Sequence, residues 1–220
     1  MAPVDLFVPR FAAEPPQDGL PYGRWAERLG QELLAACLEL QDSHEDLGEP
    51  GEIVWYPDRS WHGHTYVPAT AVTSAGYELF GYVRFVSTGE DGQEPGELTA
   101  HVDFTDQTAA ANSGWTLDLC DEVIGRWRGY GSDVAAMTLV WGRPLVSGGN
   151  VATAELSDLA VDRCELIENR FTLLAPDDYR EHLLEIKLWS SRGKELARES
   201  LYEGEEDEQE QEPQGEDPAA

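Results

Sequence analysis

The sequence predicts a mostly β fold, an antiparallel barrel or sandwich of about ten strands with one amphipathic helix before them. Three observations predict it. Apolar residues alternate with period two over much of residues 53–202, turn-forming residues separate these runs, and one stretch near the N-terminus has helical spacing. With 220 residues, 41% of them hydrophobic, the chain is the size of a single domain with a substantial core.

The predicted helix spans residues 23–41. Its apolar residues recur every three or four positions, as expected for one face of a helix: Trp25, Leu29, Leu33, Cys37 and Leu40. An isolated helix of this length is marginal in water, so we expect this face to pack on the sheet. The preceding residues 1–22 contain five prolines and are predicted to form an extended arm.

The predicted strands follow one another at short intervals after residue 52. Two long hairpins are expected, one pairing 115–128 with 134–146 and the other pairing 182–189 with 195–202. Residues 159–174 are expected to continue the sheet as one strand. No period of about 20–50 residues repeats, which argues against a propeller or a solenoid. We therefore expect one β-rich domain over residues 23–202.

Charge is the unusual feature of the composition. The chain has 43 acidic and 15 basic residues, a formal net charge of −28. Residues 203–220 hold nine acidic residues and no basic one, and they are predicted to be a disordered acidic tail. Removing these nine charges from −28 leaves −19, so the domain is acidic too. Such a field repels nucleic acids and anionic membranes and attracts basic proteins, although solubility alone also explains it.

The sequence also predicts a cytoplasmic protein. It starts without a signal peptide, and no apolar run approaches the roughly 18 residues that a membrane span needs. The three cysteines, Cys37, Cys120 and Cys164, are widely spaced and form no CxxC pair, which is typical of reduced, buried thiols.

Four polar residues on two predicted strands form a candidate metal site: His62, His64, His101 and Asp103. Residues two apart on a strand point to the same face, so each pair is expected to lie side by side. If the two strands are neighbours, three imidazoles and a carboxylate meet, a set that suits Zn, Fe(II), Mn or Ni. The alternative interpretation is that the histidines face water or pack on a tryptophan.

Five of the seven tryptophans lie on predicted strands where they are candidates to line a ligand cavity: Trp55, Trp61, Trp115, Trp127 and Trp141. Flat apolar walls suit a small molecule inside a barrel. The alternative is a core rich in aromatic residues.

Three functions remain open on the sequence. The first, which we favour, is a non-enzymatic binding or regulatory protein that engages a basic protein partner; in charge and layout it resembles histone chaperones and DNA-mimic inhibitors. The second is a small-molecule-binding barrel, and the third is a metal-dependent enzyme. No cofactor is predicted apart from the divalent metal of the third hypothesis, and no catalytic residue is assigned.

Overall fold

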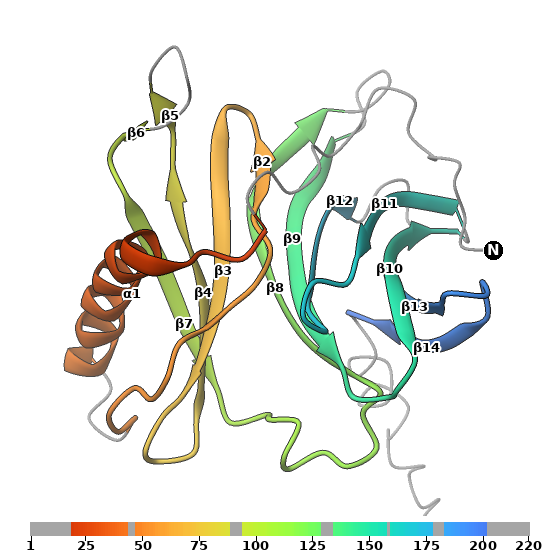
Figure 1. The fold of residues 1–220 in the computed structure, drawn as a ribbon, viewed down its shortest axis with the longest axis horizontal. Coiled ribbons are helices and arrows are strands. Elements are labelled where there is room, and N and C mark those ends of the chain that lie inside the picture. The colour runs from red at the N-terminus through yellow and green to blue at the C-terminus, as the bar shows by residue number, and fades with distance from the viewer. Residues whose placement is uncertain are drawn as a thin grey trace, which may run out of the picture.

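The computed structural model describes residues 19–43, 47–88, 94–128, 134–157, 159–177 and 183–201, whose strands form three antiparallel sheets and a short ribbon (Figure 1). The elements, in chain order, are α1 (Gly23–Ser43), β1 (Val54–Trp55), β2 (Arg59–Trp61), β3 (His64–Val72), β4 (Glu78–Phe85), β5 (Ser87–Thr88), β6 (Glu94–Pro95), β7 (Thr99–Thr105), β8 (Leu117–Arg128), β9 (Val134–Pro144), β10 (Gly149–Leu156), β11 (Leu159–Glu165), β12 (Phe171–Asp177), β13 (Leu184–Ser190) and β14 (Glu195–Ser200). The first sheet has the order β1-β3-β4-β7, with β2 paired to β3. The middle sheet is β12-β9-β8, the third sheet is β11-β10-β13-β14, and β5 and β6 form the ribbon.

The helix α1 covers one face of the first sheet, above β4 and β7 (Figure 1). Leu29 and Leu33 are buried there against Leu79. Trp25 meets Phe85 edge to face, with ring centroids 5.1 Å apart. The helical stripe thus packs on the sheet as its spacing predicts, because only a covered apolar face stabilises a helix of this length.

The middle sheet is buried on both faces. In β9, every residue from Met137 to Trp141 is at most 1% exposed. Trp141 points to the first sheet, where its ring lies 6.4 Å from that of Phe80, and by alternation Val140 points to the third sheet. A continuous apolar run instead of a polar–apolar alternation is what a doubly buried strand requires.

The third sheet packs its small and aliphatic residues on the middle sheet. Ala152 and Ala154 of β10 face the same core as their cross-strand partners Leu188 and Ile186 on β13. The opposite side of this sheet carries a buried polar network: Lys187 Nζ donates to Glu155 Oε2 at 2.8 Å. Thr153 Oγ1 donates to Glu155 Oε1 at 2.7 Å, and Trp189 Nε1 donates to Thr153 Oγ1 at 2.8 Å.

The middle and third sheets approach each other at both edges without closing into a barrel. At one edge Asp162 Oδ2 of β11 accepts the Leu174 amide of β12 at 2.9 Å. At the other, Glu199 of β14 accepts the Thr116 hydroxyl at 2.8 Å just before β8. Carboxylate side chains bridge these edges where a barrel would need backbone pairs, so the described strands make layers. No closed barrel is found among the described strands, and the expected mostly β fold with one N-terminal helix takes the form of three antiparallel sheets.

Most of the expected elements named above match the structure, and one strand does not. The helix and both long hairpins, β8–β9 and β13–β14, are confirmed. The single strand expected over 159–174 is instead two, because Glu168 and Asn169 adopt positive φ angles of 49° and 62° and turn the chain. The predicted arm lies outside the described residues as far as residue 18, and the predicted tail, 203–220, lies wholly outside them. No helix in the described ranges is long and apolar enough to cross a membrane.

The helix packing gives a stability prediction. Leu33 is 3% exposed, so Leu33→Ala should lower the free energy of unfolding by about 2–5 kcal/mol in a urea titration, through lost apolar burial and a residual cavity. Leu38→Ala is the matched control: the same change, in the same helix, at a side chain that is 54% exposed, should change it by less than about 0.5 kcal/mol. Similar losses for both variants would mean that the outer side of α1 is also covered.

Candidate functional site

The structure corrects the expected position of one predicted metal ligand, His62. It does not lie on a strand beside His64; with Gly63 it forms the two-residue turn of the β2–β3 hairpin, where Trp61 pairs with His64. The φ angles of His62 and Gly63 are 52° and 75°, the left-handed values that such a turn requires. His64 Nδ1 lies 3.2 Å from the His62 carbonyl oxygen, a contact within the turn.

His64 and His101 lie on the same face of the first sheet but do not converge. Two tyrosines stand between them, and the four rings form an aromatic row across β3, β4 and β7. The ring centroids are 6.4 Å apart for His64 and Tyr66, 5.4 Å for Tyr66 and Tyr82, and 5.7 Å for Tyr82 and His101. The row results from the register, in which Tyr82 is the direct partner of His101. Strand β4 keeps the two imidazoles apart.

His101 and Asp103 each have a partner other than a metal. His101 Nε2 lies 3.1 Å from Glu122 Oε1, so this exposed contact connects β7 of the first sheet to β8 of the middle sheet. Asp103 Oδ1 accepts the Phe104 amide at 2.8 Å. Within the ranges that the structure describes, no three His, Cys, Asp or Glu side chains are grouped to hold one ion.

The five candidate tryptophans are distributed over separate places. Trp55 belongs to the core under α1, while Trp141 is fully buried between the first and middle sheets. Trp61 and Trp127 are partly buried against the core that contains Trp141. Trp115 is half-buried in the turn before β8. They contribute to packing at several levels of the fold, as in the alternative interpretation of an aromatic-rich core.

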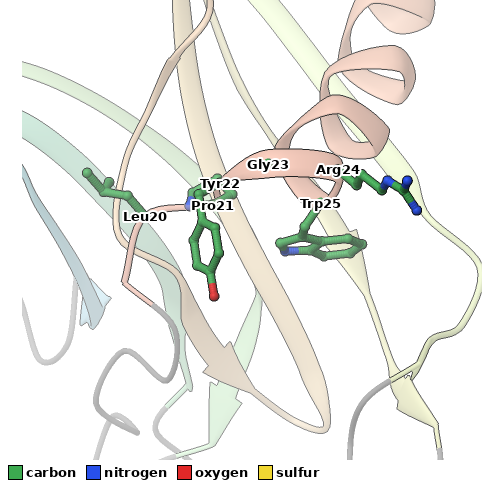
Figure 2. Close-up of a pocket in the computed structure, with 6 residues that line it drawn as sticks. All are labelled: Leu20, Pro21, Tyr22, Gly23, Arg24 and Trp25. Carbon is green, nitrogen blue, oxygen red and sulfur yellow. The ribbon is translucent and has the colours of Figure 1, made fainter.

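Two hollows lie near the start of the described chain. One, of about 380 Å³, is lined by residues 20–25, and Figure 2 shows Tyr22 and Trp25 among them. The other, of about 480 Å³, is lined in part by Glu52, Trp55 and Arg170. Arg170 carries the guanidinium in the lining of this second hollow. Its Nη1 already donates a hydrogen bond to the Trp55 carbonyl at 2.9 Å. Neither lining contains a cysteine or a histidine.

A pair of buried carboxylates occupies the far end of the core between the first and middle sheets. Asp118 accepts Arg143 Nε at 2.8 Å. Burial and the charge of Asp118 raise the pKa of Glu78, while Arg143 lowers it. Burial, with Glu78 and Asp118 nearby, also raises the pKa of Cys120 well above its ordinary value, so the thiol is not poised as a nucleophile. Glu78 and Asp118 are 9% and 6% exposed, too enclosed to meet a substrate.

The aromatic row with Glu122 is therefore the candidate site that the geometry supports best. Burial raises the pKa of Tyr66 and of Tyr82, so both phenols stay protonated at neutral pH. Tyr66 is buried, so the accessible part of the row consists of His101 and portions of His64 and Tyr82, with the Glu122 carboxylate beside His101. Sequence reasoning found His64 and His101 but missed Tyr66, Tyr82 and Glu122. The alternation of β4 pointed to Tyr82, whereas only the stacking of two sheets brings Glu122 into place.

Comparison with protein-family models, with curated proteins and with solved structures finds no significant match.

Asp121, beside Glu122, has a raised pKa, which predicts how the stability of the protein depends on pH. Asp121 is itself an exposed residue, but protein atoms displace part of the water around its carboxylate, and Asp177 and Glu122 add negative charge, which together raise the pKa of Asp121 from 3.8 to about 6. The folded state then holds a proton that the unfolded chain has released, so this contribution to stability is present below about pH 4 and is lost as the pH rises through about 6. Asp121→Asn should raise the melting temperature at pH 7.5 and leave it nearly unchanged at pH 4.

The control is Asp106→Asn, which removes the same charge at an exposed site after β7. Any gain that it shows at pH 7.5 measures the general relief of charge repulsion and is subtracted. Equal gains in melting temperature for Asp121→Asn at the two pH values would contradict a raised pKa of Asp121.

Proposed function

We propose that this protein is a non-catalytic binding or regulatory protein that engages a basic protein partner. One observation carries the proposal: the 41 residues from Phe85 to Gly125 contain nine acidic residues and no Lys or Arg. This stretch includes β7 and the first part of β8, next to the aromatic row. Asp118 in this stretch is buried and paired with Arg143, so the other acidic residues supply the negative field, which attracts cations and speeds their encounter with the protein.

The position of the basic residues supports the proposal. Two cations are withdrawn from the surface: Arg59 is 3.5 Å from Asp162 and Lys187 is 2.8 Å from Glu155, all four with buried side chains. Exposed arginines such as Arg24 and Arg128 lie elsewhere, on α1 and at the end of β8. The sequence around β7 thus has no Lys or Arg of its own between Phe85 and Gly125.

The chemistry of the described side chains also favours binding. Burial raises the pKa of Cys37 to about 11 and raises that of Cys164, so neither thiol is activated. The partly exposed rings of His64 and Tyr82 offer aromatic surface to an arginine or lysine of a partner, with Glu122 beside His101.

Binding of a cationic peptide tests the proposal. A fluorescent peptide of Lys and Arg should bind the full chain, and binding should weaken steeply from about 0.1 M salt, where the Debye length is about 10 Å, to about 1 M, where it is about 3 Å. Double-stranded DNA should not bind under either condition. A cationic peptide that fails to bind at low salt would overturn the proposal.

Truncation after residue 202 separates the tail from the domain. Removing residues 203–220, with nine acidic and no apolar anchoring residues, should leave the melting temperature nearly unchanged and weaken binding of the cationic peptide. The loss should shrink as salt rises. A truncated chain that unfolds much earlier than the full chain would show that the tail packs on the domain.

A further inference from the structure

The strand β7 forms an open edge of the first sheet. It pairs with β4 on one side, in continuous register from Thr99 opposite Arg84 to Thr105 opposite Glu78. The sheet order ends on it, and no described strand pairs with its other side (Figure 1). An edge of this kind, without a bulge or a proline, is a template for one more strand.

The backbone of β7 shows which groups point outward. The Phe104 amide is held by the carboxylate of its own neighbour, Asp103, at 2.8 Å, so it points away from β4. In an antiparallel pair the backbone groups of alternate residues point to the same side. Ala100 and Val102 therefore direct their N–H and C=O groups to the same open edge as Phe104.

The acidic side chains at this edge lie mainly on one face of the sheet. On one face, Asp103 is exposed and Glu122 reaches His101 from β8. On the other face lies α1, whose Gly30 faces Ile53 near the opposite edge of the sheet. Glu32 is two residues further along and hence about 200° further round the helix, on the flank nearest β7, which it shares with the exposed Arg28 one turn before it.

A cation on the neighbouring strand already has a partner. Arg84, opposite Thr99 on β4, lies close to the Tyr66 phenol and lowers its pKa against the larger effect of burial. Another edge strand, β8, is interrupted by a bulge between Val123 and Gly125 and ends in Arg126 and Arg128, so it suits neither continuous pairing nor a basic partner.

We propose that the β7 edge binds an extended basic segment of the partner protein, which adds a strand to the first sheet. This inference rests on the proposed function and specifies its site. Backbone hydrogen bonds to Ala100 and Val102 provide the register, and alternate Lys or Arg side chains meet Asp103 and Glu122. Asp103 releases the Phe104 amide when the strand arrives.

The test uses the full chain and two peptides. The first peptide alternates Lys and Val over 7 residues, the length of β7. The second has the same sequence with every other backbone nitrogen methylated, which keeps the charge and removes the hydrogen bonds of one edge. The methylated peptide should bind at least about tenfold more weakly, as the loss of two or three backbone hydrogen bonds implies. The amides of Ala100 and Val102 should gain protection from hydrogen exchange with the first peptide only.

A matched pair of proline variants locates the site on the protein. Ala100→Pro removes an outward N–H that β4 does not use, a position where an edge strand tolerates proline. This variant should bind the unmethylated peptide about tenfold more weakly, because blocking the edge at residue 100 also removes the backbone hydrogen bonds at the neighbouring outward positions. Ala110→Pro, in the exposed turn after β7, should bind like the wild type. If Ala100→Pro does not fold, the comparison of the two peptides decides alone.

The outcomes separate this inference from the proposed function. Equal binding of both peptides, or wild-type binding by a folded Ala100→Pro, overturns strand addition and leaves the acidic surface as the binding site. No binding by either peptide or by the Lys and Arg peptide overturns both. Protection of Ala100 and Val102 in the protein alone, with a doubled native mass, assigns the edge to a second copy of this chain and overturns the inference.

Discussion

Burial of β9 on both faces is the constraint on which the other layers depend. A strand whose residues from Met137 to Trp141 are all enclosed needs an apolar surface on each side. The first sheet supplies one with Phe80, and the third sheet supplies the other with Ala152 and Leu188. The first sheet then needs a cover for its outer face, and α1 provides it. The order of the layers thus follows outward from one strand (Figure 1).

Buried polar groups fix how the layers are aligned. Arg59, on β2, donates to the Arg163 carbonyl at 3.2 Å and lies 3.5 Å from Asp162, which connects the first sheet to β11 of the third. Burial raises the pKa of Asp162, and the guanidinium together with two backbone amides opposes that shift. Such a pair adds little net stability, but either partner alone would be an uncompensated buried charge. The contact therefore serves mainly to specify how the two sheets are aligned and adds little to the free energy of unfolding.

The parts of the fold that sequence predicts are those governed by local periodicity. The stripe through Leu29 and Leu33 defines α1, and the turn-rich loops define the two long hairpins. Sheet membership depends on contacts between residues far apart, and no local pattern contains it. The same limit applies to the candidate site. His101 is visible as a polar residue on a strand, while its partner Glu122 becomes visible only once β7 and β8 lie in different, stacked sheets.

The open edge of β7 also bears on the solution behaviour of the protein. An edge that accepts a foreign strand also accepts its own copy unless something prevents the approach, and here long-range repulsion between acidic molecules does so. This protection depends on pH, because the net charge of the protein does. Near the acidic isoelectric point the repulsion disappears while the backbone groups of the edge remain, and the sheet becomes a nucleus for aggregation. The acidity of the chain then acts as a colloidal safeguard, and purification or crystallisation at low pH removes it.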